Sequence, residues 1–363
     1  MTHKLVKYKW RLTPFLPLLW LYHAIVAIRN FCYDHGIFKS IRLPALVISI
    51  GNLSMGGTGK TPLTIFLAMA LRDAGWRVAI VARGYRRQKS GLVVVSDGQR
   101  LLADLAEAGD EPLLMAQACK GIPVIVDRQK KIAAMVAVEK FTPDIILVDD
   151  GFQHRQLYRD IDIVMLEAAT PVNNFGLSSG APWREPISAL RRADFIIINM
   201  NSQTDDQAYH RLAGQCRAHT NAAIFSGKLK AVAWRELAKP ATNPLLPLEI
   251  VDDQPVMLVS GIARPGRFRE LVEKLDAQVR HEMIFSDHHD YQQKDFQAIV
   301  STFNASGARY ILTTTKDSVK LAALTVSHES AATLPVLVLE TVLEPEPEFL
   351  SALIASIHQK VTR

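Results

Sequence analysis

One short segment of this chain has the residue types and spacing needed to bind the phosphates of a nucleotide. Residues 51–61 read GNLSMGGTGKT and stand between an apolar run and a segment typical of a helix. In such a loop, glycines let successive backbone N–H groups point at phosphate oxygens, a lysine reaches the β- and γ-phosphates, and a hydroxyl binds Mg²⁺. The segment therefore predicts a P-loop, although Ser54 stands where the usual pattern has its first glycine.

The P-loop interpretation assigns a role to each residue of the loop. We expect Lys60 to supply the positive charge and Thr61 to bind Mg²⁺. A glycine-rich turn without a ligand is the alternative, and the position of Lys60 argues against it. The residues predicted to contact the nucleotide are Ser54, Met55, Gly56, Gly57, Thr58, Gly59, Lys60 and Thr61.

A second apolar run, DIILVDD at residues 144–150, ends in two acids. A strand of this kind places its terminal carboxylate beside the P-loop, where it can hold Mg²⁺ directly or through water. We therefore predict that Asp149 is a metal ligand together with Thr61. Capping of the following turn is the alternative for Asp149, and it is a stronger alternative for Asp150. These residues indicate a protein that binds a nucleoside triphosphate with Mg²⁺.

The reaction class is narrowed by a residue that the loop lacks. Related ATPases that pair or sit on membranes often carry a second lysine early in the loop, where this chain has Met55. This difference favours a kinase for a small or lipid acceptor over a motor, partitioning or metallochaperone protein. Such a kinase needs a base across the phosphates from the P-loop. The segment AGDEP offers Asp110 and Glu111, and FSDHHDY offers two adjacent histidines.

Both candidate segments also have ordinary interpretations. Asp110 opens a predicted helix and has the position of an N-cap, and FSDHHDY could be a polar surface turn. The paired histidines lack a third ligand at a spacing that would complete a zinc site. A His–Asp pair that assists a proton transfer is therefore the better functional interpretation, and the residues leave open whether His288 or His289 would act.

The composition bounds the class of protein. The chain has 363 residues, of which 48% are hydrophobic and 21% charged, so it can bury a sizeable core and is long enough for two domains. The net charge of +6 suits an acidic partner such as phosphate, nucleic acid or an anionic membrane, without choosing among them. The 3 cysteines form no CxxC pair, which argues against a disulfide framework or a zinc ribbon and favours a reducing cytoplasm.

The elements that must position these residues follow an alternating pattern. Helix-length segments, for example 61–74 and 127–140, separate short apolar runs. This alternation predicts an α/β fold with a P-loop NTPase-like, mostly parallel sheet that has helices on both faces. The runs that predict strands buried on both faces are residues 45–50, 77–82, 123–126, 144–150, 161–166 and 194–199.

The first forty residues differ from the rest, because basic residues flank an apolar run at positions 12–28. A signal peptide would need a small-residue cleavage site that is missing here. A spanning helix would need a longer run without early prolines. We therefore favour a helix in the membrane interface, anchored by Trp10, Trp20 and Tyr22. A first helix packed on the core of a soluble protein and a spanning helix are the alternatives.

The organisation along the chain suggests three parts. The strand and helix pattern loosens over residues 201–247, which predicts a linker or a domain boundary, and it resumes with strands at 256–260, 309–314 and 335–339 and a last helix from Pro347. We predict a membrane-associating helix in residues 1–40, a P-loop kinase core in residues 41–220, and a smaller α/β domain with the C-terminal helix in residues 221–363.

Several motifs, in one order along the chain, resemble those of a known family. They are GNLSMGGTGKTP, ARGYRR at 82–87, GDEP at 109–112, VDDGFQHR at 148–155, REP at 184–186, SGIARP at 260–265 and FSDHHDY at 285–291. Together they resemble the tetraacyldisaccharide 4'-kinase family of lipid A synthesis over nearly the whole chain. One difference is TTTKD at 313–317, where the family more often has T-T-E-K-D.

The resemblance implies an ATP-dependent enzyme on the cytoplasmic face of the Gram-negative inner membrane, peripheral or monotopic through its N-terminal helix. With ATP and Mg²⁺ it would phosphorylate the 4'-hydroxyl of an acylated glucosamine disaccharide 1-phosphate to give lipid IVA. An acylated substrate does not leave a bilayer easily, since each buried CH₂ is worth about 0.8 kcal/mol. No nucleic acid is expected as a partner, and no obligate protein partner is evident.

The resemblance also implies roles for individual residues. Asp110 matches the catalytic base, and His288, which directly follows Asp287, is chosen over His289 as its partner. Lys60 would act on the transferring phosphoryl group, and Thr61 and Asp149 match the Mg²⁺ ligands. Polar residues around the cleft are matched by Asp150, Gln153, Arg184 and Glu185.

Two other classes of protein would explain part of the sequence. A membrane-associated P-loop GTPase or ATPase switch would use the P-loop and the basic helix without any acceptor, and lipid would not affect its nucleotide hydrolysis. A soluble metabolite kinase would use the same P-loop, but it would work without detergent and would survive loss of the first helix.

Overall fold

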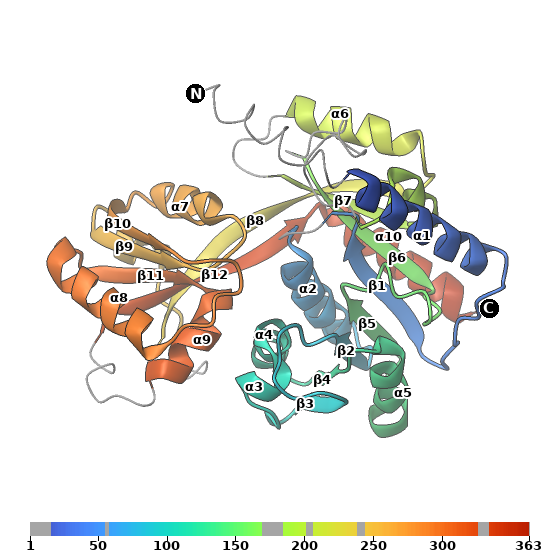
Figure 1. Cartoon of the computed structure of the whole chain (residues 1–363), viewed down its shortest axis with the longest axis horizontal. Helices are drawn as coiled ribbons and strands as arrows, with labels where there is room; N and C mark the ends of the chain where they lie inside the picture. The colour runs from blue at the N-terminus through green and yellow to red at the C-terminus, as the bar shows by residue number, and fades with distance from the viewer. Residues whose placement is uncertain are drawn as a thin grey trace.

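A computed structural model shows a twelve-stranded mixed sheet that runs through both halves of the molecule (Figure 1). The structure describes residues 16–54, 58–168, 184–200, 206–237, 244–325 and 334–362, with the side chains of residues 16–20 and 325 left out. The strands are β1 Leu46–Asn52, β2 Val78–Ala82, β3 Val93–Asp97, β4 Pro123–Val126, β5 Ile145–Asp149, β6 Ile161–Glu167, β7 Phe195–Met200, β8 Ala223–Glu236, β9 Pro255–Ser260, β10 Gln278–Ile284, β11 Tyr310–Thr314 and β12 Val336–Pro345.

Helices cover both faces of this sheet (Figure 1). The order of the strands is β10-β9-β11-β12-β8-β7-β6-β1-β5-β2-β4-β3. The helices are α1 Leu16–Asp34, α2 Lys60–Asp73, α3 Leu105–Ala108, α4 Asp110–Ala118, α5 Lys130–Phe141, α6 Asp206–Arg217, α7 Pro265–Glu273, α8 Gln293–Ser306, α9 Thr315–Thr325 and α10 Pro347–Val361, with short 3₁₀ segments η3 Ile187–Arg192 and η4 Leu248–Val251.

The N-terminal half, which contains β1–β7, is the predicted P-loop sheet. Its strands pair in parallel, except that the edge strand β3 is antiparallel to β4. Successive side chains of a strand point to opposite faces, so Ile48 of β1 packs with Leu67 of α2 while Val47 packs with Ala133 of α5. Because both faces are covered, most positions of each strand are apolar, and this pattern made the strands predictable. All six predicted strands are present.

The C-terminal half, which contains β9–β11, continues the same sheet. β9 pairs in parallel with β10 and β11, and β11 pairs in parallel with β12. Helix α7 packs on one face through Phe268, and α8 and α9 pack on the other face through Ile299 and Leu321. The two long strands β8 and β12 pair antiparallel and join the two halves (Figure 1).

Strand β8 corrects one expectation. We predicted a linker or boundary over residues 201–247, and the structure places a 14-residue strand there, Ala223–Glu236. Most of its residues are exposed or partly buried, so the sequence contains no apolar run that would predict a strand. The strands β3 and β10 were missed as well, and every residue of the edge strand β10 is exposed or half-buried.

The C-terminal helix lies on a different half from the one we expected. Phe349, Leu353 and Ile357 of α10 are buried in the core cluster of the N-terminal half, beside α2 and β1. These residues recur every four positions and form one apolar stripe. The long strand β12 carries the chain back from the C-terminal half, which explains the return. The boundary between residues 220 and 221 stays a prediction.

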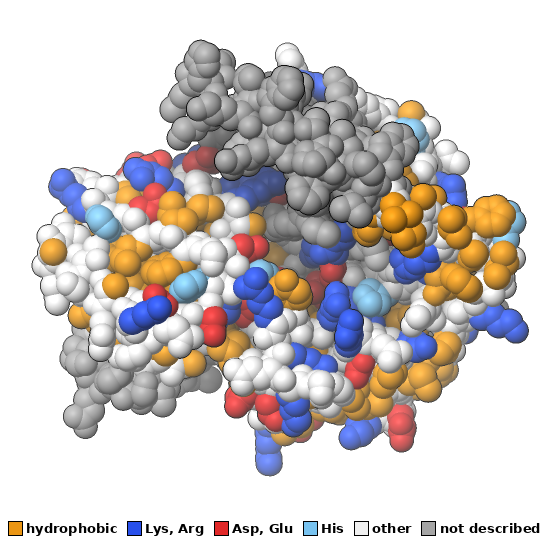
Figure 2. Space-filling view, in the orientation of Figure 1, with side chains coloured by type: hydrophobic (Ala, Val, Ile, Leu, Met, Phe, Trp, Pro, Cys, Tyr) orange, Lys and Arg blue, Asp and Glu red, His pale blue; other side chains and the backbone are white. Residues whose placement is uncertain are grey.

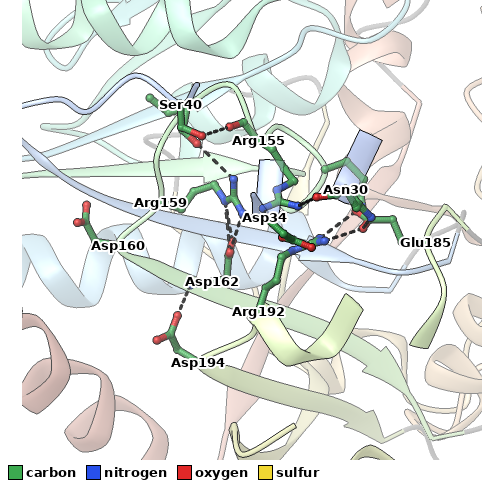
Figure 3. Close-up of polar contacts among 12 residues, drawn as sticks. Asn30, Asp34, Ser40, Arg155, Arg159, Asp160, Asp162, Glu185, Arg192 and Asp194 are labelled. Atoms are coloured by element: carbon green, nitrogen blue, oxygen red, sulfur yellow. Dashed lines mark hydrogen bonds and ion pairs between the residues drawn. The ribbon is translucent and has the colours of Figure 1, made fainter. Parts of the chain in front are cut away.

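Helix α1 is attached to the N-terminal half by buried polar side chains (Figure 3). Asn30 Nδ2 donates to Glu185 Oε2 at 2.8 Å, and Arg192 donates to both carboxylate oxygens of Glu185 at 2.9 and 3.1 Å. One turn further along α1, Asp34 pairs with Arg155 at 2.8 Å. Within the described residues, no helix is both long enough and apolar enough to cross a bilayer.

Candidate active site

The P-loop connects β1 directly to α2. Met55, Gly56 and Gly57 lie outside the described residues. Gly59 has φ +93° and forms the N-cap of α2, which begins at Lys60. A Cβ at Gly59 would approach Asn199 Nδ2 to 3.2 Å, so both the backbone angle and the available space favour glycine here.

Two asparagines that we did not predict hold the described part of the loop. Asn52 Nδ2 donates to Thr58 Oγ1 at 3.1 Å, and Asn199 Nδ2 donates to the Thr58 carbonyl at 3.1 Å. Asn52 is the last residue of β1 and Asn199 the last but one of β7, and both are buried. The signal was present in the sequence, because each asparagine follows an apolar run at the carboxyl end of a predicted strand, where open α/β sheets bind ligands.

Lys60 lies in a short chain of charged groups. Its Nζ is 3.5 Å from Asp150 Oδ1, and Arg184 donates to the same oxygen at 2.5 Å. Burial would raise the pKa of Asp150, but the cations Lys60, Lys130 and Arg184 hold it below its usual range. Asp150 is therefore an anion that orients the P-loop lysine from the turn after β5.

Asp149, the predicted metal ligand, is buried at the end of β5. Thr64 Oγ1 donates to its Oδ1 at 3.1 Å. Burial, with the nearby carboxylates Glu111 and Asp150, raises the pKa of Asp149 to about 6. A carboxylate in such an environment gains from a nearby divalent cation, and Mg²⁺ is commonly held by one or two carboxylates together with phosphate oxygens. Asp149, with the Thr61 hydroxyl in the first turn of α2, therefore fits a Mg²⁺ site.

Lys130 lies fully buried beneath these acids and was not predicted. Its Nζ donates to the backbone carbonyls of Asp149 at 2.7 Å and Asp150 at 2.5 Å. Burial lowers the pKa of Lys130 to about 8, against the raising effect of the two carboxylates. The side chain fixes the turn that carries both acids. No motif marks it, since it is one of several basic residues at the start of α5.

Asp110 and His288 meet across the two halves of the molecule. His288 Nδ1 lies 2.9 Å from Asp110 Oδ2, although 178 positions separate them in sequence. His289 instead contacts Asp295 at 3.0 Å. Of the two histidines, the structure therefore brings His288 to the carboxylate that we predicted as the base.

The carboxylate of Asp110 is not a helix cap. The N-cap of α4 is Gly109, which has φ +84°, and Asp110 occupies the first helical position. Its Oδ1 accepts from the Glu111 N–H at 3.1 Å. Burial would raise its pKa, but the hydrogen bond with His288 and the positive charge of Lys320 hold the pKa of Asp110 far below its usual range.

The remaining predicted cleft residues fall in two places. Gln153 Nε2 donates to the Asn52 carbonyl at 2.9 Å, so it supports the P-loop strand. Arg184 lies on Asp150, as described above. Glu185 is fully buried beneath α1 with Asn30 and Arg192. It is a structural anchor of that helix and not a residue on an open surface.

The geometry combines two sets of groups. The P-loop lysine and the two acids at the end of β5 belong to the N-terminal half, and the Asp110–His288 pair spans both halves. Basic side chains gather on the face where the halves meet (Figure 2). Such an arrangement can bind a nucleotide on one side and hold a carboxylate ready for the proton of an acceptor hydroxyl on the other.

Comparison with known proteins gives consistent matches. The family model for LpxK, tetraacyldisaccharide-1-P 4'-kinase, matches residues 11–358. The chain is 37% identical over 312 residues to the tetraacyldisaccharide 4'-kinase of Syntrophus aciditrophicus, covering 83% of this chain and 82% of that protein. It is 34% identical over 308 residues to the same-named protein of Aquifex aeolicus, covering 84% of this chain and 89% of that protein.

A solved structure matches along almost the full length. The crystal structure of the "apo" form of LpxK from Aquifex aeolicus in complex with ATP superposes with a TM-score of 0.74 at 31% identity. The match covers 95% of this chain and 98% of the other. The likeness therefore includes both halves of the sheet.

Proposed function

The chain belongs to the tetraacyldisaccharide-1-P 4'-kinase family, and from that premise we propose that it transfers the γ-phosphoryl group of ATP to the 4'-hydroxyl of tetraacyldisaccharide 1-phosphate. The product is lipid IVA, an intermediate of lipid A synthesis. The observation that carries the proposal is the contact of Asp110 with His288, because it brings a carboxylate anion and its orienting histidine to the half that carries the P-loop. A nucleotide switch without an acceptor would not need such a pair.

Each part of the reaction can be assigned to particular residues of the chain. Lys60 binds the phosphates and stabilises the charge on the transferring group. Asp110 orients the 4'-hydroxyl and takes its proton as the hydroxyl oxygen bonds to the γ-phosphorus. The bond between that phosphorus and the β–γ bridging oxygen breaks, and ADP leaves. Thr61 and Asp149 would hold Mg²⁺, which supplies charge neutralisation at the phosphates.

We also propose that α1 lies in the interface of the inner membrane on its cytoplasmic side. Its exposed face carries Leu21, Ile25, Ile28 and Phe31, each more than half exposed, and the buried side of the helix is turned to Glu185 and Arg155 through Asn30 and Asp34. Hydrophobic side chains gather on the surface where α1 and the loop after it lie (Figure 2). A lipid surface fits a row of apolar side chains on a helix that is fixed to the body by its other face.

The apolar face continues beyond the helix. Ile37, Phe38 and Ile41, in the loop that leads to β1, are also exposed. Tyr22 in α1 donates to the Arg184 carbonyl at 3.2 Å, and Arg184 contacts Asp150 beside the P-loop. The proposed membrane surface and the P-loop are therefore joined by contacts within one half, which suits an acceptor that stays anchored in the bilayer.

Transfer of label tests the function directly. The purified protein, in detergent, is incubated with ATP labelled at the γ-phosphate and with tetraacyldisaccharide 1-phosphate. We expect label in the lipid for the natural chain and its loss in Lys60→Ala, because the lysine contributes several kcal/mol to transition-state binding in such sites. Label released as inorganic phosphate at a rate that lipid does not change would instead support the nucleotide-switch alternative.

A further inference from the structure

Helix α9 of the C-terminal half packs against α4 of the N-terminal half, beside the Asp110–His288 pair. Two lysines, Lys316 and Lys320, stand four residues apart on α9 and therefore share one face of the helix. Lys316 Nζ is 3.0 Å from His288 Nε2, and Lys320 Nζ is 3.0 Å from Asp110 Oδ2. The four side chains form a continuous row from one lysine to the other.

The row fixes the tautomer of His288. A protonated lysine has three donors and no acceptor, so His288 Nε2 must accept from Lys316. The imidazole then carries its hydrogen on Nδ1 and donates it to Asp110 Oδ2. In this arrangement both ring nitrogens are occupied, and His288 orients the carboxylate without being the first acceptor of a proton.

Other charged and polar groups lie around the row, but they do not take over the contacts that the two lysines make with Asp110 and His288. On α4, Glu111 lies 3.5 Å from Lys316, and beside His288 the carboxylate of Asp287 lies 3.7 Å from Lys316. Arg86 donates to the His288 carbonyl, and the Tyr85 ring packs edge-on against the imidazole. Within the described residues, Lys320 is the cation paired directly with the Asp110 carboxylate.

Burial makes the pairing with Lys320 important. The Asp110 side chain is 4% exposed and that of Lys320 is 12% exposed, so water screens the pair weakly. A buried carboxylate without a cation tends to bind a proton, since desolvation disfavours the charged form. A protonated Asp110 could not accept the hydroxyl proton.

We propose that Lys316 and Lys320 are positioning residues for the phosphoryl transfer, Lys320 by keeping Asp110 an oriented anion and Lys316 by holding His288 in its Nδ1–H tautomer. This inference rests on the proposed kinase function. The row assigns the proton of the acceptor hydroxyl to Asp110, whose Oδ1 is engaged by a single backbone N–H. His288 keeps its own proton throughout the transfer.

The first test separates positioning from nucleotide binding. In the labelled-lipid assay, Lys320→Met should lower kcat about tenfold or more while the KM for ATP stays within about twofold. The loss should grow as the pH is lowered, because Asp110 then binds a proton more readily. Lys320→Arg should recover most of kcat, since it returns the charge. Lys274→Met, an exposed lysine at the end of α7, is the control and should change neither constant.

The second test determines the tautomer of His288 and requires no catalytic turnover. Nitrogen NMR of the ¹⁵N-histidine-labelled protein, with His288→Gln used to assign the signal, should show a bare Nε2 and a protonated Nδ1. In Lys316→Met, His288 Nε2 loses its hydrogen-bond donor, so the Nε2 signal should change and the Nε2–H tautomer should become populated.

The outcomes separate a failure of the proposed function from a failure of the roles assigned to the two lysines. If the natural chain does not label lipid, the proposed function fails. If it does, the roles assigned to the lysines can still fail in two ways. Lys320→Met could leave kcat unchanged, with or without a raised KM for ATP. Alternatively, His288 of the natural chain could carry its hydrogen on Nε2. Thermal unfolding of each variant identifies a loss that comes from misfolding, and in that case the Lys320→Arg variant and the NMR spectrum of His288 in the natural chain decide.

Discussion

Asp110 is the residue at which a structural and a catalytic role can be separated by one substitution. Asp110→Asn keeps the size of the side chain and an oxygen that can accept from the Glu111 N–H, but it cannot take a proton. We expect kcat for lipid phosphorylation to fall by about 10² or more, with little change in ATP affinity. Steady-state kinetics and nucleotide binding check this, and an activity within a few-fold of the natural chain would contradict the role of the carboxylate.

The two adjacent histidines supply the matched control for this prediction. His288 contacts Asp110 and His289 contacts Asp295, so His288→Ala should lower kcat and His289→Ala should leave most of it. If Asp110 and His288 act as a unit, the double variant should lose little more than the worse single variant. Additive losses would show that His288 acts elsewhere.

His154, in the turn after β5, makes stability depend on pH. Burial and the nearby charge of Lys130 lower its pKa to about 3. In the unfolded chain the imidazole titrates near pH 6.5, so between these two values the unfolded state binds more protons and stability falls as the pH falls. At pH 5 the loss relative to pH 7 should approach about 2 kcal/mol.

The contribution of His154 can be isolated by substitution. His154→Gln cannot bind a proton in the unfolded state, so the urea midpoint of this variant should change less between pH 7 and pH 5 than that of the natural chain. Equal shifts of the two midpoints would assign the acid sensitivity to other groups.

At the scale of elements, α1 has two faces with different functions. Replacement of Leu21, Ile25 and Ile28 by serine should release the protein from vesicles that contain anionic lipid, because each apolar side chain contributes about 1.5 to 3 kcal/mol when it is fully buried. Flotation of the protein with vesicles measures the effect. Serine at Leu92, Leu101 and Leu102, which are exposed in the region of β3, is the control and should leave flotation unchanged.

The buried face of α1 explains why substitution is a better test than truncation. Removal of the first thirty residues would also remove Arg29, which donates to the Gln153 carbonyl, and Asn30, which donates to Glu185. Both contacts lie within the N-terminal half, and Gln153 in turn supports the strand that leads into the P-loop. We therefore expect truncation to lower stability as well as membrane binding, whereas the serine variants change the exposed face alone.

At the scale of the whole molecule, the halves are joined by β8 and β12 and, besides the contacts of Asp110, by the buried carboxylate of Glu167. Glu167, at the end of β6, pairs with Arg264 and with Arg267 of the segment that opens α7, the latter at 2.9 Å. Its side chain is 1% exposed. Removing one partner of such a buried pair typically costs about 3 to 5 kcal/mol.

Glu167→Gln should therefore lower the melting temperature and loosen the contact between the halves. The Asp110–His288 pair spans the same boundary, so kcat should fall while ATP binding to the N-terminal half is kept. Glu344→Gln is the matched control, because its pair with Lys230 is about half exposed on both sides and such pairs contribute less than about 1 kcal/mol. Equal melting temperatures for the two variants would argue against Glu167 as a link between the halves.

The sequence by itself determined the features that depend on local pattern. The P-loop and the two acids at the end of β5 lie in short segments that residue type and spacing are sufficient to identify. The six buried strands of the N-terminal half were predictable because helices cover both of their faces, so most of their positions are apolar. The order of the motifs was sufficient to indicate the family.

The tertiary structure decided which distant residues meet. Strand β8 is half exposed and leaves no apolar run, and α10 packs on the N-terminal half because β12 carries the chain back. The contact of His288, and not His289, with Asp110 depends on the packing of α9 and the loop after β10 against α4. The lysines of that row and the carboxylate of Glu167 carry no motif. A contact between residues that are distant in sequence is created by the approach of two elements, and it leaves no periodic signal in either of them.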